Sequence, residues 1–252
     1  MNKTVIKRGM EVTVAVEDLA FQGRGVAKIE GLVVFVDGGL PGDTARVEIT
    51  RTRRKHIESK VLEIIEPSPF RIEPRCAHFG LCGGCRLQDL ADEQQLAFKA
   101  AQVRNQLTRI GGLDDPGEIP IIPCAPTFGY RNKMEFTFGT DADRAQALGL
   151  HPRGKYWEVF NLRECWLPPE SFARIAAITR DFFAQTTHQP YHPREHTGFL
   201  RFLVVRVGQN TGQILVNLVT ANGVVERAAE WVGVLREAVP DIVTIVHTIN
   251  DR

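Results

Sequence analysis

Three cysteines lie within ten residues of one another in the segment "CAHFGLCGGCRLQDL", at 76–90. Cys76, Cys82 and Cys85 follow the spacing C-x5-C-x2-C, and a fourth cysteine, Cys165, comes eighty residues after Cys85. Thiolates are soft ligands that bind zinc, copper and iron–sulfur clusters. In a chain without an apparent export signal, clustered thiols favour a metal site over a set of disulfides.

The spacing also bears on the kind of metal. Structural zinc usually takes two short-spaced pairs of ligands, whereas three thiolates from one loop plus a distant fourth are typical of an iron–sulfur cluster. Gly83 and Gly84 would let the backbone pass close to a bulky cluster. The residues therefore favour an iron–sulfur site and leave zinc as the alternative, with His78 able to replace one thiol. We interpret Cys124 as an ordinary small side chain.

Length and composition set the class of protein. The chain has 252 residues, a net charge of +1 and 43% hydrophobic residues, values that suit a globular protein with two cores. No apolar run approaches the roughly eighteen residues of a membrane span, and the N-terminus does not resemble a signal peptide. We expect a cytoplasmic monomer that is not bound to membranes. Any nucleic-acid surface must then come from local basic patches.

Residues 1–66 are predicted to form an all-β domain. Short runs rich in Val, Ile, Thr and Phe, separated by Gly, Pro or Asp, lie at 10–20, 25–31, 32–39, 43–50 and 56–65. Five short strands in a unit of this size suit an OB-type barrel, a fold that often binds oligonucleotides.

Basic and aromatic residues between these strands are candidate nucleic-acid contacts. Cationic side chains can pair with phosphates, and an exposed aromatic ring can stack on an unpaired base. The alternative is a solvated hairpin face, or charge that protects an exposed strand edge. The candidates, including two from the later segment "YRNK", are Phe21, Arg24, Lys28, Arg51, Arg53, Arg54, Lys55, Arg131 and Lys133.

The rest of the chain reads as a connecting region, 67–127, followed by an α+β domain, 128–252. The connecting region holds the cysteine loop and a helix over 92–110, for which Asp92 and Gln95 resemble a capping box. In the second domain the predicted strands come in pairs between helices, a pattern that favours an α+β layer. Strands are expected at 130–140, 147–151, 156–160, 199–207, 213–220 and 242–249, and helices at 169–185 and 223–238.

Several segments resemble a known family. The stretch "GRGVAKIEGLVVFVDGGLPGD" at 23–43 resembles a TRAM domain, an OB-type RNA-binding module. The cysteine segment, followed by "YRNKMEFTFG" and "RECWLP", resembles the iron–sulfur and central domains of the 23S rRNA (uracil-5-)-methyltransferases. The resemblance runs along essentially the whole chain. It places the family's four cluster ligands on Cys76, Cys82, Cys85 and Cys165, and so implies a [4Fe-4S] cluster and 23S rRNA as the partner.

The resemblance also implies a reaction. Such enzymes add a cysteine thiolate to C6 of uracil, transfer a methyl group from S-adenosylmethionine to C5, and remove the C5 proton with a carboxylate. This chain shows neither a glycine-rich turn for S-adenosylmethionine nor a spare catalytic cysteine, because the family's methyltransferase domain would follow "VTIVHTINDR" at 243–252. We expect an RNA-recognition and iron–sulfur portion that is inactive alone, with no catalytic residue and with S-adenosylmethionine bound only by the missing domain.

Other functions remain open at this point. One is a stand-alone, non-enzymatic iron–sulfur RNA-binding protein, and another is a tRNA uracil-C5 methyltransferase. A radical S-adenosylmethionine enzyme is disfavoured, because its C-x3-C-x2-C motif leaves one iron open whereas four thiols close the site. We expect a structural cluster that ties the loop at 76–85 to Cys165 and so fastens the helix at 92–110 onto the central sheet. A redox role is the alternative.

Overall fold

The computed structural model describes residues 6–251, so residues 1–5 of the predicted first domain and Arg252 of the second lie outside the described part. The chain divides into two compact units. Unit 1 comprises Met1–Pro74 and Arg86–Cys124, and unit 2 comprises Arg75–Cys85 and Ala125–Arg252. The segment 67–127 is therefore shared. Its cysteine loop groups with the second unit and the remainder groups almost entirely with the first.

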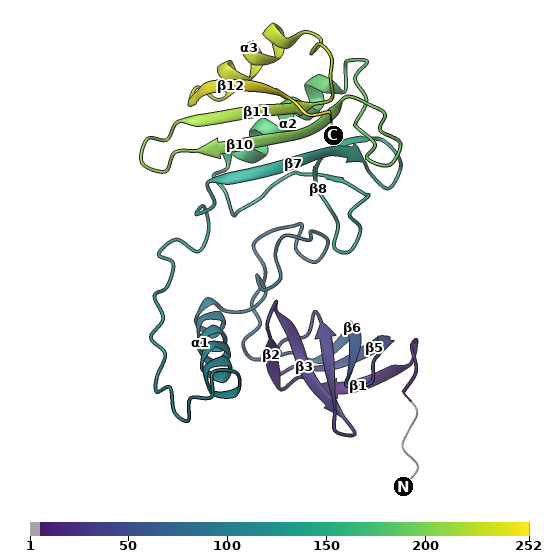
Figure 1. Ribbon diagram of the computed structural model, residues 1–252, viewed down its shortest axis with the longest axis vertical. Coiled ribbons are helices and arrows are strands. Elements are labelled where there is room, and N and C mark those ends of the chain that lie inside the picture. The colour runs from purple at the N-terminus through teal and green to yellow at the C-terminus, as the bar shows by residue number, and fades with distance from the viewer. Residues whose placement is uncertain (1–5, 252) are drawn as a thin grey trace. The chain divides into compact units, whose positions relative to one another are not determined.

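Unit 1 contains a single curled sheet of six strands (Figure 1). The order across the sheet is β1-β5-β6-β4-β3-β2, in which β4 and β6 run parallel and all other neighbours run antiparallel. The strands are β1 (Glu11–Ala15), β2 (Asp18–Ala20), β3 (Arg24–Ile29), β4 (Leu32–Asp37), β5 (Thr44–Thr52) and β6 (His56–Glu66). One run of the sequence, 10–20, makes two strands where a single strand was predicted.

The break between those two strands curls the sheet. Val16 donates its amide to the carbonyl of Asp43 at 2.8 Å, and Glu17 donates to Val26 at 2.8 Å. The chain thus steps from the β5 edge to the β3 edge within two residues, which brings the ends of the sheet round an aliphatic core. Gly25 must be glycine, because a Cβ there would lie 2.7 Å from a backbone oxygen of Gly39. The core residues are Val14, Val16, Ala27, Val34, Val36, Ala45, Val47, Ile49 and Ile57.

Helix α1 (Asp92–Arg109) also belongs to unit 1. Gln102 donates its side-chain amide to the carbonyl of Leu19 at 2.8 Å. Phe98 packs against a small cluster formed by Leu19, Leu40 and Leu90. The helix therefore packs with the barrel, which corrects the expectation that it is fastened onto the central sheet.

The start of α1 differs from the predicted capping box. Its N-cap is Ala91, which makes no side-chain cap, and Asp92 lies in the first turn. Gln95 turns back and donates to the carbonyls of Leu87 and Leu90, each at 2.9 Å. Gln95 thus satisfies carbonyls of the preceding turn rather than an amide of the cap.

Unit 2 is a mixed sheet with two helices (Figure 1). The strand order is β12-β11-β10-β7-β8-β9, with β11 and β12 parallel and joined through α3, and with the other neighbours antiparallel. The elements are β7 (Lys133–Thr140), β8 (Gln146–Leu150), β9 (Phe160–Asn161), α2 (Ser171–Phe183), β10 (Leu200–Val207), β11 (Ile214–Thr220), α3 (Ala228–Ala238) and β12 (Ile242–Ile249). The expected α+β character is thus observed.

The two faces of this sheet have different surroundings. Phe136 and Phe138 of β7 lie in one core with Phe183 of α2 and Trp231 of α3. Side chains alternate between the faces of a strand, so Thr137 and its register partner on β10, Phe202, lie on the opposite face. Among the described residues no helix is both long and apolar enough to cross a bilayer.

The prediction of a strand at 156–160 is wrong for most of its length. Tyr156 and Trp157 lie in a turn, and only Phe160 and Asn161 pair with β8. Aromatic residues favour strands only when a pleated, half-buried surface receives them. Here the rings of Tyr156 and Trp157 are exposed instead.

Candidate metal centre and nucleic-acid interface

The cysteine loop is built onto one side of unit 2 by backbone hydrogen bonds. Gly83 donates its amide to the carbonyl of His151 at 3.1 Å, and Arg153 donates to Leu81 at 2.8 Å. The Arg153 guanidinium also donates a hydrogen bond to the carbonyl of Cys85 at 3.0 Å. The loop that carries Cys82 and Cys85 is therefore attached to the segment that follows β8.

A second set of contacts attaches the start of the loop to the segment after β9. Ala77 donates its amide to the Glu164 carboxylate at 2.6 Å. The Arg75 guanidinium lies 3.6 Å from the ring centroid of Trp166, a cation–π contact. Because Arg75 precedes Cys76 and Trp166 follows Cys165, this stack holds the backbones of the first and fourth cysteines together.

The four thiols form one electrostatic group. Burial is the main cause that raises the pKa of Cys165 to about 11; the neighbouring thiols Cys85, Cys76 and Cys82 also raise it, and a backbone hydrogen bond from Leu167 opposes them. Burial also raises the pKa of Cys82 and of Cys76. Four thiolates held together in this way repel one another, and bound metal would remove that repulsion. The donor set therefore fits a thiolate-ligated metal centre.

Backbone amides add to this fit. Gly84 donates its amide to the Cys82 sulfur at 3.3 Å, and backbone donors also face Cys76 and Cys165. Within residues 6–251, no three His, Cys, Asp or Glu side chains converge on a point that could hold a single metal ion. A cluster takes its thiolates at separate irons and so needs sulfurs that are further apart than the ligands of one ion.

His78 has a different role from that of a substitute ligand. Its Nε2 accepts the amide of Arg163 at 3.1 Å, and its ring packs on Phe160 with the centroids 4.9 Å apart. The nitrogen that accepts this bond has no lone pair left for a metal. Cys124 is exposed and belongs to unit 1, whereas the four thiols belong to unit 2.

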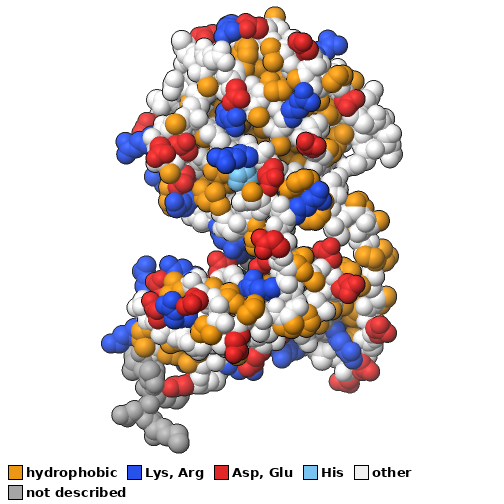
Figure 2. Space-filling view, turned by 180° about the vertical axis from the view of Figure 1, so that it is seen from behind, with side chains coloured by type: hydrophobic (Ala, Val, Ile, Leu, Met, Phe, Trp, Pro, Cys, Tyr) orange, Lys and Arg blue, Asp and Glu red, His pale blue; other side chains and the backbone are white. Residues whose placement is uncertain are grey.

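Four of the predicted RNA contacts lie together on one hairpin of unit 1. Arg51 lies at the end of β5, and Arg53, Arg54 and Lys55 form the turn into β6, with all four side chains exposed. We call these four residues the basic hairpin. On the face of the molecule seen in Figure 2, Lys and Arg side chains are interspersed with Asp and Glu, so a local cluster of this kind is needed to create a positive surface.

The candidate RNA contacts in the β2–β3 region differ in how available their side chains are to a ligand. Phe21 is 70% exposed at the turn, so its ring is available for stacking. The Arg24 guanidinium lies 4.7 Å from the centroid of the Phe35 ring. Lys28 forms an exposed ion pair with Glu17 at 3.0 Å, which reduces its availability for a phosphate.

The two candidates at the start of β7 lie in unit 2. Arg131 is exposed, and its backbone amide is bonded to the carbonyl of Leu167. Lys133 lies 3.7 Å from Glu135 in an exposed pair. The structure thus brings the basic hairpin together, and it places Arg131 and Lys133 in the other unit.

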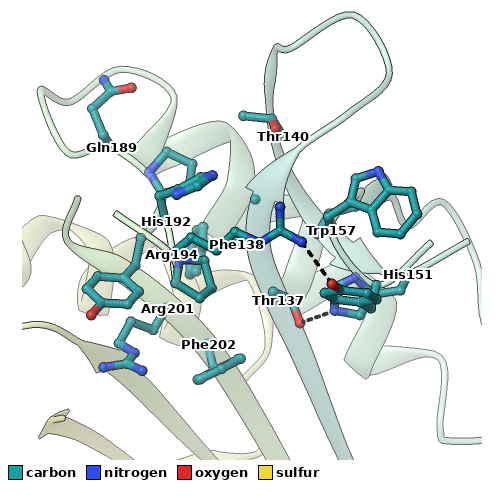
Figure 3. A pocket seen from close by; sticks show the side chains of 16 residues that line it. Thr137, Phe138, Thr140, His151, Trp157, Gln189, His192, Arg194, Arg201 and Phe202 are labelled. Carbon is teal, nitrogen blue, oxygen red and sulfur yellow. Dashed lines mark hydrogen bonds between the residues drawn. The ribbon is translucent and has the colours of Figure 1, made fainter. Parts of the chain in front are cut away.

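Sequence reasoning missed a pocket in unit 2. It has a volume of about 390 Å³ (Figure 3) and is lined by residues that include Thr137, His151, Tyr156, Trp157, Tyr191, His192, Arg194, Arg201 and Phe202. We call it the aromatic pocket. One signal was present in the sequence. Adjacent Tyr156 and Trp157 would point to opposite faces of a strand, so one large ring would have been exposed there without a partner.

Comparison with known proteins gives the family context. A family model described as TRAM domain matches residues 6–62. An uncharacterized RNA methyltransferase of Caldanaerobacter subterraneus is 36% identical over 246 residues, which cover 97% of this chain and 54% of the relative. Another uncharacterized RNA methyltransferase, from Nitratidesulfovibrio vulgaris, is 38% identical over 246 residues, which cover 97% of this chain and 52% of the relative. The chain spans about half the length of the curated relatives it matches.

A solved structure agrees with these relatives. The crystal structure of Pyrococcus abyssi tRNA (uracil-54, C5)-methyltransferase in complex with S-adenosyl-L-homocysteine matches with a TM-score of 0.63 and 26% identity. The match covers 87% of this chain and 48% of that protein. Residues 6–62 are therefore a TRAM domain, and over nearly its whole length this chain is homologous to about half of the RNA methyltransferases that it matches.

Proposed function

We propose that this chain is the RNA-recognition and iron–sulfur portion of an S-adenosylmethionine-dependent uracil-C5 methyltransferase that acts on 23S rRNA. The observation that carries the proposal is the gathering of four thiols from two distant segments within a chain that also contains a TRAM domain. An RNA partner and reduced thiols both agree with the cytoplasmic location predicted from the sequence.

Cys76, Cys82, Cys85 and Cys165 would hold a [4Fe-4S] cluster. The cluster would supply a covalent link between the cysteine loop and the segment after β9, because metal binding energy becomes folding energy when the ligands come from separate segments. The Arg75–Trp166 stack and the amide of Gly84 would position the thiolates for it. We favour this structural role over redox chemistry.

We assign no catalytic residue to this chain. The relatives are about twice as long as the segment that matches this chain. We place S-adenosylmethionine binding and methyl transfer in the part of those proteins that the chain does not match. The contribution of the chain would be to bind the RNA and orient the target uridine toward that part.

The basic hairpin should supply a large part of the RNA affinity. Replacing Arg51, Arg53, Arg54 and Lys55 with glutamine should weaken binding of single-stranded RNA. The slope of log affinity against log salt concentration should become less steep by roughly 3, because four phosphate contacts no longer release counterions. Fluorescence anisotropy at several salt concentrations measures both effects.

The matched control is a variant of α1 in the same unit. Lys99, Arg104 and Arg109 are also exposed, and their replacement with glutamine should change the salt dependence much less. Equal effects in the two variants would mean that the affinity reflects overall charge, and the role of the hairpin would then be abandoned.

A tRNA substrate is the second candidate. The similarity to a tRNA (uracil-54, C5)-methyltransferase at a TM-score of 0.63 favours it. Competition between a transcript of 23S rRNA and unmodified tRNA for the purified chain separates the two. Preference for the rRNA transcript at equal salt supports our proposal, whereas preference for tRNA would reassign the substrate.

A further inference from the structure

The aromatic pocket lies on the face of the unit 2 sheet that the helices do not cover. Its floor includes Thr137 of β7 and Phe202 of β10, which are register partners on that face. The segment 151–157 forms one wall and the segment 189–194 forms the other (Figure 3). Its volume of about 390 Å³ falls within the range of sites that bind small organic groups.

Two aromatic rings are exposed at the mouth of the pocket. Tyr156 is 68% exposed and Trp157 is 62% exposed. Their rings meet edge to face at 84°, with the centroids 5.1 Å apart, so this contact covers no more than one broad face of one ring. Exposed rings of this size beside a pocket indicate a binding surface rather than a packing role.

Cationic groups supply the charge of the pocket. Its lining includes two arginines and no carboxylate. Arg194, which is labelled in Figure 3, extends from the 189–194 wall and donates to the Tyr156 hydroxyl at 2.9 Å. Arg201 lies over the ring of Tyr191, 4.2 Å from its centroid. The lining therefore suits an anion that carries a flat ring, and it disfavours a cationic ligand.

The walls are held in place before any ligand binds. Nδ1 of His151 lies 2.9 Å from the carbonyl of Glu158, so this nitrogen carries the proton. Nε2 then accepts the Thr137 hydroxyl at 3.2 Å. The opposite wall is fixed by the amide of His192, which donates to the carbonyl of Thr197 at 2.7 Å. A preformed pocket loses little entropy when a ligand enters.

We propose that the aromatic pocket binds one unpaired nucleotide of RNA, with the base stacked on Trp157 and a phosphate on Arg194. The inference rests on the proposed RNA-binding function and adds a specific contact to it. The nucleotide is unpaired because a base in a duplex has both faces covered by its neighbours, whereas a single strand can splay a base onto a protein ring.

The test uses the anaerobically purified chain and a labelled oligouridylate of about ten nucleotides, a length within the site sizes of single-strand binders. Trp157→Ala should weaken binding roughly tenfold, the expected effect of losing one stacked base. Trp157→Phe keeps a ring and should recover most of the affinity. Val224→Ala, which trims another exposed apolar side chain of unit 2, is the control and should bind as the wild type does.

The outcomes separate this inference from the broader function. Wild-type binding that Trp157→Ala leaves unchanged would overturn the pocket assignment while RNA binding stands. Failure of the wild type to bind any RNA would overturn both. If uridine monophosphate quenches Trp157 fluorescence and oligouridylate does not compete, the ligand is a free nucleotide and the RNA assignment is wrong. Competition by the oligonucleotide supports it.

Discussion

Cys165→Ser should abolish the proposed [4Fe-4S] centre and lower the stability of unit 2. The side chain comes from the segment after β9, whereas the other three proposed ligands come from one loop, so its loss would remove the proposed link between the two segments. Serine is a much weaker ligand for iron than a thiolate. Iron and sulfide contents should fall to near zero, and the melting temperature should fall by about 5 °C or more, which corresponds to roughly 2 kcal/mol.

Cys124→Ser is the matched control. Cys124 is exposed and belongs to unit 1, so its replacement should leave iron, sulfide and melting temperature unchanged. Cluster assembly that survives in Cys165→Ser would contradict the assignment of the fourth ligand. Loss of iron without loss of stability would contradict the structural role and favour a redox role.

Cys165→Ser should also weaken ligand binding at the aromatic pocket. The cysteine loop is bonded to His151 and Arg153, and the segment 151–157 is one wall of the pocket. A loosened loop should leave that wall less well fixed, because part of its backbone bonding comes from the loop. We expect the affinity for oligouridylate to fall severalfold in Cys165→Ser, as measured by anisotropy.

Asp43→Asn should destabilise unit 1 by about 3 kcal/mol, near the lower end for breaking a buried pair. Asp43 is 1% exposed. Its carboxylate accepts the amides of Leu40 at 2.6 Å and Ser68 at 2.8 Å, and it pairs with the Arg71 guanidinium at 2.7 Å. Asparagine keeps the shape, but it turns one acceptor into a donor that faces Arg71. Urea unfolding measures the loss.

An exposed ion pair in the same barrel provides the comparison. Glu17 pairs with Lys28 at 3.0 Å with both side chains largely exposed, so Glu17→Gln should cost less than about 1 kcal/mol. If the two variants lose the same stability, the buried network does not anchor the segment after β6.

The network also predicts a pH dependence. Burial alone would raise the pKa of Asp43, but the hydrogen bond from Arg71 and those from the backbone outweigh it and hold the pKa below 3.8. A lowered carboxyl pKa contributes stability that is complete above the unfolded value and is lost as the pH falls through the folded value. Burial raises the pKa of Asp89, the other partner of Arg71, so Asp89 opposes this trend. The difference in unfolding free energy between wild type and Asp43→Asn should therefore shrink as the pH falls from about 6 to about 3.

Much of the architecture could be predicted from local patterns. Alternation of β-branched residues located the barrel strands, and the helices expected at 169–185 and 223–238 correspond to α2 and α3 with ends that differ by up to five residues. These patterns repeat over a few residues, so they depend little on what packs against them. The start of α1 was less predictable, because Gln95 bonds to Leu87 and Leu90 in a turn that local spacing does not reveal.

The sequence by itself determined the four candidate thiol ligands, the TRAM segment and the basic hairpin, because residue types and local motifs are enough to recognise each of them. Only the tertiary structure decided which elements hold them. It attached the cysteine loop to the segments after β8 and β9, grouped α1 with the barrel, and turned Tyr156 and Trp157 from a predicted strand into the mouth of a pocket. These outcomes depend on contacts between residues about seventy to ninety positions apart, such as Gly83 with His151 and Ala77 with Glu164. Such contacts form only when the sheet brings those segments together, and the period of a local pattern carries no information about them.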